Sequence, residues 1–191
     1  MTLILDTDRL ILRPLEASDV DIATTCWTDP EVTKYVAERS FSAEDVASEM
    51  PTVIRRCAGG AIGIWCVMRK DTGEKLGSAF LLPLPVDLDD TDWSLVQGEG
   101  IPDAEVEIGY VFKRTAWGQG YATEACSRLL QFAFETTQIP KIVAVTDPEN
   151  HVSGRVLLKS GMRPAGTIHA YSEDLPGYRL SAAQWRRARA G

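Results

Sequence analysis

Two glycines, Gly118 and Gly120, most constrain what this chain can fold into. They separate a strand-like segment, residues 105–112, from an amphipathic segment, residues 118–137, whose apolar residues share one helical face. Glycine permits a tight turn and lets a ligand approach the backbone closely. The helix that follows begins with unpaired N–H groups and the positive end of its dipole. A strand, a glycine turn and a helix start together predict an anion-binding loop.

The bulk composition is that of a water-soluble globular protein. The 191 residues are 45% hydrophobic and 25% charged, which suits one domain, residues 1–191, with a sizeable core. A net charge of −7 argues against non-specific nucleic-acid binding, which requires clustered Lys and Arg. No apolar run reaches the roughly 18 residues of a membrane-spanning helix. Residues 1–6 lack the basic segment of a signal peptide, so we expect a cytoplasmic protein with no membrane or nucleic-acid partner.

The cysteine and histidine content argues against a metal site. No two cysteines have the CxxC spacing, and the chain contains only two histidines, His151 and His169. We therefore expect no metal, and free buried thiols in a reducing compartment. The cysteines are Cys26, Cys57, Cys66 and Cys126.

Periodic apolar residues and turn residues divide the chain into strands and helices. The predicted strands are residues 9–13, 61–69, 75–82, 105–112, 141–145, 162–171 and 178–180. The predicted helices are residues 18–27, 30–36, 42–56, 118–137, 150–160 and 181–189. Residues 83–103 form an unusually long loop, rich in Pro, Gly and Asp, of the kind that is often functional.

Local signals mark several helix ends. Helix starts with the spacing of a capping box occur at Ser18 with Asp21, Ser42 with Asp45, and Ser181 with Gln184. Pro51 is expected to kink or split its helix. Gly161 is well suited to end the helix at residues 150–160.

The order of the elements predicts a mixed α/β protein of the α+β type. We expect a central, mostly antiparallel sheet of about six or seven strands, flanked by helices. The strand at residues 105–112, the following helix and the strand at residues 141–145 form a βαβ unit. Those two strands are therefore predicted to be parallel.

Two familiar phosphate-binding patterns do not fit the glycine turn. A dinucleotide fold requires GxGxxG, but Thr123 occupies the third glycine position. A mononucleotide P-loop requires Lys and Ser or Thr after its second glycine, but Tyr121 follows Gly120. The anion therefore has to be identified from other parts of the sequence.

Four segments, in order and correctly spaced, resemble one family. The chain resembles GNAT-type N-acetyltransferases of the ribosomal-protein-alanine acetyltransferase (RimJ/RimL-like) branch over nearly its whole length. The matching segments are Thr7 to Pro14 (T-E-R-L-x-L-R-P in the branch), Glu107 to Tyr110 (E-I-G-Y), Trp117 to Ala125 (W-G-x-G-x-A-T-E-A), and Asn150 with Ser153, Leu157, Lys159 and Gly161 (N-x-x-S…L-x-K-x-G). One departure is Thr115, where the general family motif carries Gln or Arg.

The resemblance implies a GNAT acyl-CoA N-acyltransferase fold and acetyl-CoA as the acetyl donor. The backbone of the glycine turn would hold the pyrophosphate, namely Gly118, Gln119, Gly120, Tyr121, Ala122 and Thr123. The backbone of Val111, Phe112 and Lys113 would pair with the pantetheine arm like an added strand, and Asn150 would touch the same arm. The implied reaction is transfer of the acetyl group to a primary amine, a protein N-terminus or a small molecule, by direct attack in a ternary complex.

Attack by an amine favours a general base, because few amines are neutral at pH 7. Glu107 matches the position where many relatives keep a base, and the alternative is a solvated carboxylate on a strand. Ser153 matches a proton donor to the departing thiolate, and the alternative is a helix residue bonded to nearby backbone. Weaker candidates are Glu105 and Glu173 as bases and Tyr171 and Tyr178 as donors.

The acceptor is less constrained than the donor. The acidic residues of the 83–103 loop favour a cationic small-molecule or peptide amine, although a solubilising loop explains them equally well. These residues are Asp87, Asp89, Asp90, Asp92, Glu99 and Asp103. A non-catalytic acyl-CoA-binding or regulatory module is the alternative function, and the chain is expected to be a monomer or a homodimer.

Overall fold

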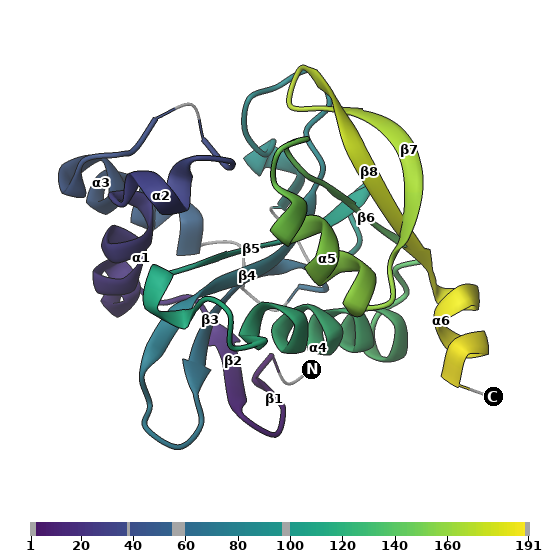
Figure 1. Ribbon diagram of the computed structural model, residues 1–191, viewed down its shortest axis with the longest axis horizontal. Helices are drawn as coiled ribbons and strands as arrows, with labels where there is room; N and C mark the ends of the chain where they lie inside the picture. Colours follow the sequence, from purple (N-terminus) through teal and green to yellow (C-terminus); the bar gives the residue numbers. More distant parts are fainter. Residues whose placement is uncertain (1–2, 38, 55–59, 97–99, 190–191) are drawn as a thin grey trace.

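The computed structural model describes residues 3–37, 39–54, 60–96 and 100–189 (Figure 1). Eight strands form one sheet in the order β1-β2-β3-β4-β5-β6-β8-β7. The strands are β1 (Leu5–Asp6), β2 (Leu10–Pro14), β3 (Gly63–Arg69), β4 (Lys75–Pro83), β5 (Val106–Phe112), β6 (Lys141–Val145), β7 (Arg163–Ala170) and β8 (Glu173–Ser181). The predicted α+β architecture is confirmed. The strand count is one higher than predicted, because β1 has two residues and is too short to show alternation.

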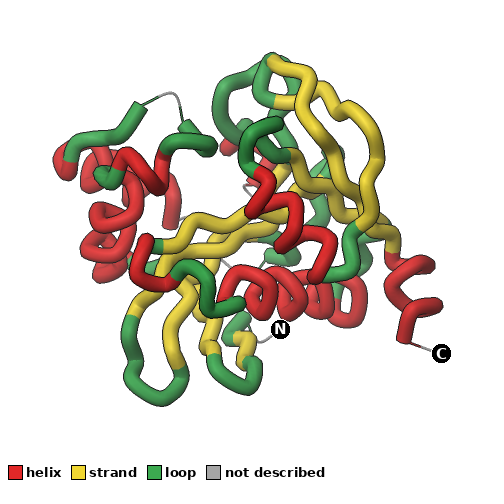
Figure 2. The backbone as a smooth tube through the Cα atoms, viewed as in Figure 1, coloured by secondary structure: helices red, strands yellow, loops and turns green. Residues whose placement is uncertain are grey.

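Helices flank both faces of the sheet (Figure 2). The α-helices are α1 (Val20–Trp27), α2 (Pro30–Thr33), α3 (Ala43–Ile54), α4 (Tyr121–Thr136), α5 (His151–Lys159) and α6 (Ala182–Arg189). Short 3₁₀ turns are η1 (Ala17–Asp19), η3 (Trp93–Val96) and η4 (Arg114–Ala116). The register confirms that β5 and β6 are parallel, and the other paired strands are antiparallel.

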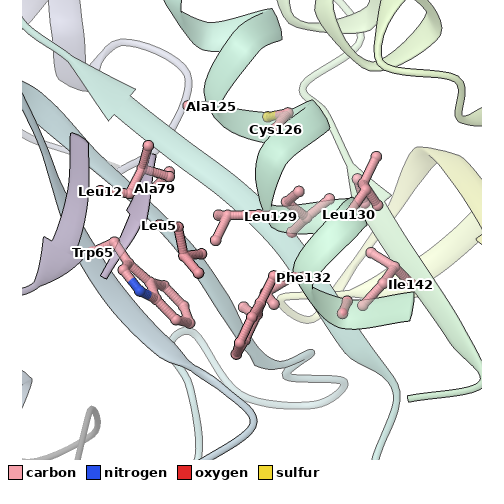
Figure 3. Packing of buried hydrophobic residues seen from close by; sticks show 14 of the residues in the cluster. Leu5, Leu12, Trp65, Ala79, Ala125, Cys126, Leu129, Leu130, Phe132 and Ile142 are labelled. Carbon is pink, nitrogen blue, oxygen red and sulfur yellow. The ribbon is translucent and has the colours of Figure 1, made fainter. Parts of the chain in front are cut away.

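The largest core cluster lies between α4 and the sheet (Figure 3). Apolar residues of α4 such as Leu129 and Phe132 pack on Leu12, Trp65 and Ile142 from three strands. The Trp65 and Phe132 rings meet edge to face with centroids 5.6 Å apart. A second cluster on the opposite face joins α1 and α3 to β3, β4 and β5. These two layers fix the position of β5, which the candidate site requires.

Several predicted boundaries were wrong. The 18–27 helix is not capped by Ser18 with Asp21, because the Asp19 side chain instead accepts the Glu16 N–H at 2.9 Å. The α2 helix ends at Thr33 rather than residue 36. The α3 helix continues through Pro51 without splitting. Its predicted end at Arg56, and Cys57, lie outside the described residues; Cys26, Cys66 and Cys126 are buried free thiols.

In the C-terminal half, the predicted element boundaries agree better with the structure. α4 begins at Tyr121 rather than Gly118, because the glycine turn itself is not helical. β8 begins at Glu173 rather than residue 178, so β7 and β8 form a long hairpin. The 83–103 loop contains η3. The caps at Ser42 and Ser181 are confirmed, since each hydroxyl accepts the N–H three residues later, at 3.0 and 3.2 Å.

Candidate functional site

The sheet opens between its two parallel strands. β5 pairs with β6 at two positions, the second of which is Glu107↔Val143. Beyond this pair, β5 continues along β4 while β6 continues along β8. Figure 1 shows β6, β8 and β7 fanning away from β4 and β5. Within the described chain, residues 108–112 of β5 therefore have a partner strand on one side and an open edge on the other.

The sheet's hydrogen bonds indicate which backbone groups face the open edge. Glu105 and Lys113, at the two ends of β5, both make backbone bonds on the β4 side, of 2.8 and 3.0 Å. The β4–β5 register runs without a shift between them. Because successive residues of an antiparallel ladder direct their polar groups to alternate sides, Tyr110 and Phe112 direct their N–H groups to the open edge. A ligand chain lying there meets strand-like donors and acceptors.

The residues predicted to pair with a pantetheine arm are only partly placed to do so. The Lys113 N–H is bonded to the sheet, and its ammonium lies 2.7 Å from Glu74. By the same alternation, the backbone N–H and C=O of Val111 point toward β4. The Phe112 carbonyl accepts a hydrogen bond from the Trp117 indole at 2.8 Å. Of the three predicted residues, Phe112 thus contributes an open-edge N–H. Tyr110, which was not among the predicted residues, contributes another.

The glycine turn has the conformation that an anion-binding loop requires. Gly118 and Gly120 have φ angles of +73° and +80°, which L side chains rarely adopt. Gly120 is the N-cap of α4 and makes no side-chain cap, so the first N–H groups of the helix receive no acceptor from it. A Cβ at Gly118 would meet no atom within 4 Å, which leaves its surroundings open. The predicted residues 118–123 therefore fit a pyrophosphate group.

Two residues near the start of the chain hold the first turn of α4. The Arg9 guanidinium contacts the Glu124 carboxylate at 2.6 and 2.7 Å and donates to the Gln119 carbonyl at 3.0 Å. The Thr7 hydroxyl donates to Glu124 at 2.5 Å. The guanidinium also lies 4.7 Å from the centre of the Tyr121 ring. The motif that contains Arg9 and the motif that contains the glycine turn are thus in direct contact.

The α5 helix bridges the two separating halves of the sheet. Asn150 caps it, since its Oδ1 accepts the Ser153 N–H at 3.1 Å. The Ser153 hydroxyl lies 2.9 Å from the Tyr110 hydroxyl on β5. On the β8 side, a Cβ at Gly154 would lie 2.5 Å from the Tyr178 hydroxyl, so a larger residue there would displace the Tyr178 side chain. The start of α5 therefore gathers three hydroxyl groups beside the opening.

Glu107 is a buried carboxylate at the point where β5 and β6 separate. It is 4% exposed, and the Tyr171 hydroxyl from the β7–β8 turn donates to its Oε1. Burial raises the pKa of Glu107 to about 7; the Tyr171 hydrogen bond lowers it, and the negative charge of Asp90 raises it. A carboxyl group with this pKa is well matched to accept a proton near neutral pH.

Tyr171 is held in place by its own backbone. Tyr171 and Ser172 have positive φ angles of 55° and 59°, which are uncommon outside glycine. Their N–H groups donate to the carbonyls of Pro85 and Val86 at 3.0 and 2.8 Å. The hairpin tip is thus fastened to the start of the 83–103 loop. This attachment presents the Tyr171 hydroxyl to Glu107.

Glu107 and Ser153 lie on opposite faces of the sheet. Side chains alternate along β5, so Glu107 shares a face with Val111 while Tyr110 points to the other face. Val111 packs with residues of α1 and α3, whereas Tyr110 packs against the cluster that contains α4. Ser153 contacts Tyr110 and therefore belongs to the α4 face. The predicted base and the predicted donor flank the opening from its two sides.

The weaker candidates have other partners or lie at the surface. Glu105 forms an ion pair with Lys141 at the start of β6. Glu173 is exposed. His169 is exposed and lies 2.8 Å from Asp174, which raises its pKa. Tyr178 belongs to the group of hydroxyls around Ser153, and Tyr171 is the residue bonded to Glu107.

The acidic residues of the 83–103 loop are not equivalent. Asp87 faces a histidine of β7, and Asp92 accepts from the backbone of η3. Asp90 accepts from the Trp93 indole at 2.9 Å and acts electrostatically on Glu107. Asp89, Asp90 and Asp103 are exposed, and Glu99 lies outside the described residues. Of this group, the structure relates Asp90 to the buried carboxylate.

Among the described residues, no three or more His, Cys, Asp and Glu side chains are grouped so as to hold a metal ion. No helix in that part of the chain combines the length and apolar composition needed to cross a bilayer.

Sequence reasoning missed two contacts and one residue of the site. It did not connect Tyr171 to Glu107, which lie 64 positions apart, or Arg9 to Glu124, 115 positions apart. It also did not single out Tyr110, although this residue belongs to the E-I-G-Y segment. The one available signal was that Arg9 and Glu124 each fall inside a motif.

Comparisons with known proteins agree with this geometry. The family model described as acetyltransferase (GNAT) domain matches residues 9–163. The chain is 29% identical over 168 residues to uncharacterized N-acetyltransferase p20 of Bacillus licheniformis, covering 87% of this chain and 86% of that one. A GNAT-family acetyltransferase from Bacillus anthracis matches the structure with a TM-score of 0.73 at 24% identity, over 94% of this chain and 99% of that one. An aminoglycoside acetyltransferase, AAC(6')-Ib, solved with coenzyme A and kanamycin, gives a TM-score of 0.72 at 18% identity, over 94% and 99% of the two chains.

Proposed function

This chain belongs to the acetyltransferase (GNAT) domain family, and we propose that it transfers an acetyl group from acetyl-CoA to a primary amine by direct attack, with Glu107 as the general base. The observation that carries the proposal is the position of Glu107. It is a buried carboxylate with a pKa near 7, at the point where β5 and β6 separate. The open edge of β5 leads from this carboxylate toward the glycine turn.

The donor side of the proposal rests on backbone groups. The residues 118–123 would hold the pyrophosphate, since Gly118 and Gly120 adopt the required φ angles and the α4 N-terminus has no side-chain cap. The open-edge N–H groups of Tyr110 and Phe112 would bind the pantetheine arm. Acetyl-CoA, when bound, supplies a thioester whose leaving thiol has a pKa near 8.5, by analogy with cysteine.

The proposed base and the proposed proton donor lie on the two opposite faces of the opening. On the Glu107 face, the carboxylate would accept a proton from the attacking amine, directly or through a water molecule. On the opposite face, the Ser153 hydroxyl, bonded to Tyr110, would donate a proton to a departing thiolate. An N–H on the open edge would stabilise negative charge on an oxygen lying beside it. Hydrogen bonds already hold both side chains in place, from Tyr171 to Glu107 and between Tyr110 and Ser153.

An acceptor screen tests the function directly. The full chain is incubated with acetyl-CoA and a panel of free amino acids, polyamines, aminoglycosides and peptides with free N-termini, and the released thiol is measured. We expect thiol release that depends on at least one amine. Acetyl-CoA binding without thiol release for any amine would favour the alternative function, a non-catalytic acyl-CoA-binding or regulatory module.

Tyr171→Phe should weaken the enzyme mainly at low pH. Its hydrogen bond lowers the pKa of Glu107, so removing the hydroxyl should raise that pKa by about one unit. The acid limb of kcat/KM should then move to higher pH, with about a tenfold loss near pH 6.5 and a smaller loss above pH 8. The measurement is the pH profile of kcat/KM for an amine identified in the screen.

Tyr178→Phe is the matched control for this prediction. Tyr178 lies with Ser153 on the opposite face, so its hydroxyl should not affect the titration of Glu107. If Tyr171→Phe leaves the acid limb unchanged, Tyr171 does not tune the base. The same conclusion follows if both variants move it equally.

We further propose that the acceptor is cationic and that Asp90 contributes to this preference. Asp90→Asn should raise KM for a cationic amine about two- to fivefold at low salt, with a smaller effect at high salt. Asp89→Asn is the control, because Asp89 is the adjacent exposed carboxylate on the same loop and is not among the groups that shift the pKa of Glu107. Equal KM values for wild type and Asp90→Asn, across salt concentrations, would refute the role of Asp90.

We also propose three narrower assignments, which are based on the sequence motifs and the composition. They are membership of the RimJ/RimL-like branch, a cytoplasmic location, and action as a single domain over residues 1–191. The acceptor screen bears on the first, because that branch predicts activity on peptide N-termini.

A further inference from the structure

Glu124 places a negative charge where the proposed function needs an anion to bind. It lies in the first turn of α4, four residues after the N-cap Gly120. A carboxylate there stabilises the helix through its dipole, but it also opposes a second anion at the same helix end. The proposed pyrophosphate site therefore requires this charge to be neutralised or directed away.

Arg9 satisfies that requirement with four contacts in one place. Its Nε and Nη2 contact the Glu124 carboxylate at 2.7 and 2.6 Å, and its backbone N–H donates to the same carboxylate at 3.0 Å. Its Nη1 donates to the Gln119 carbonyl at 3.0 Å. Glu124 is 18% exposed in its side chain, so the ion pair is only partly screened by water.

The contact with Gln119 acts on the shape of the glycine turn. Gln119 lies between Gly118 and Gly120, so its carbonyl is one of the polar groups of the turn that would repel an anion lying beside it. The Arg9 guanidinium satisfies this carbonyl and also lies next to Gly120, where an added Cβ would be 3.5 Å from its Nη2. Because Arg9 binds the Gln119 carbonyl, this carbonyl is directed to the guanidinium, and the N–H groups of the turn can bind an anion.

We infer that Arg9 is a positioning residue for the cofactor loop, which neutralises Glu124 and holds the Gln119 carbonyl so that the turn can receive an anion. This inference rests on the proposed function, because it assumes that the anion is the pyrophosphate of acetyl-CoA. It adds a charge-balancing role for the N-terminal motif that neither the sequence pattern nor the fold assigns.

A binding cycle tests the inference independently of catalysis. The affinity of the full chain for acetyl-CoA is measured by calorimetry for wild type, Arg9→Met, Glu124→Gln and the double variant. We expect Arg9→Met to weaken binding about tenfold at low salt, with a smaller defect at high salt. In the Glu124→Gln background the same change should cost much less, because the carboxylate is no longer charged.

Arg128→Met is the matched control. Arg128 also joins α4 to the N-terminal segment, through the Asp6 carbonyl at 3.1 Å, but one turn further along the helix. It should lower the melting temperature without weakening acetyl-CoA binding. An Arg9→Met defect that is equal in both Glu124 backgrounds and independent of salt would overturn the charge-balancing role. A wild-type chain that does not bind acetyl-CoA would overturn the proposed function itself, and with it the role of Arg9.

Discussion

Glu107→Gln is expected to lower kcat/KM by at least about 100-fold at pH 8 and to remove the acid limb of the pH profile near pH 7. Glutamine keeps an oxygen that can accept the Tyr171 hydrogen bond, so the site should retain its shape. It cannot take a proton from an amine. The measurement is kcat/KM from pH 5.5 to 9 for wild type and variant with the same amine.

The same substitution, which lowers activity, should raise the stability of the protein at high pH. The pKa of Glu107 is raised from 4.5 to about 7 by burial. Its protonated form therefore contributes stability that is present below about pH 4.5 and is lost as the pH rises through about 7. Glu107→Gln avoids this loss, and relative to pH 4 it should gain about 3 kcal/mol on wild type by pH 8. Denaturant unfolding at the two pH values measures the difference.

Glu105→Gln is the control for both measurements. Glu105 lies two residues earlier and is paired with Lys141 rather than with Tyr171. It should keep the acid limb and show no comparable gain in stability at pH 8. A Glu107→Gln protein whose kcat/KM matches wild type at every pH would remove Glu107 from the mechanism.

Local features of the site could be predicted because they depend on neighbouring residues. Gly118 and Gly120 indicate positive φ angles, since the backbone of other residues rarely adopts them. The capping residues Ser42 and Ser181 bond within three positions of themselves. The parallel pairing of β5 and β6 follows from one βαβ connection. Each inference needs only a short stretch of sequence.

The contacts that give the site its chemistry could not be predicted in this way. Glu107 acquires its pKa from burial and from Tyr171, which belongs to the β7–β8 turn and lies 64 positions later in the chain. The N–H group on the open edge is that of Tyr110 rather than that of Val111, because pairing with β4 determines which residues of β5 direct their N–H groups to that edge. Such facts depend on contacts between segments that are far apart in the sequence, and no short stretch of sequence specifies these contacts.

Asp19 shows how tertiary partners override local capping signals, and its replacement is expected to lower stability strongly. Ser18, Asp19 and Asp21 are all capable of capping the start of α1. Asp19 is the N-cap residue of α1, but its side chain makes no cap hydrogen bond there. It is instead fully buried between Arg13, which contacts both its oxygens at 2.7 Å, and Lys75, at 2.9 Å. This cluster ties β2 and the start of α1 to β4, the strand that holds β5.

Asp19→Asn should lower the free energy of unfolding by about 3 kcal/mol at pH 7, because it leaves Arg13 and Lys75 around a neutral group. Burial alone would raise the pKa of Asp19, but the hydrogen bonds from Arg13, the Glu16 N–H and Lys75 lower it to about 2. The carboxylate therefore contributes stability above its unfolded pKa, about 3.9, and loses it as the pH falls toward 2. The difference between variant and wild type should accordingly be largest above about pH 5 and should shrink toward pH 2.

Asp21→Asn separates this buried cluster from an ordinary surface ion pair. Asp21 contacts the same Lys75 at 2.7 Å, but its side chain is 65% exposed, so its loss should cost less than about 1 kcal/mol. Denaturant unfolding of both variants from pH 3 to 8 provides the comparison. Because Asp19 acts on the support of β5 and not on the opening, folded Asp19→Asn protein should keep the acid limb set by Glu107. A change in that limb, or equal losses for the two variants, would mean that the cluster does not act as a structural anchor.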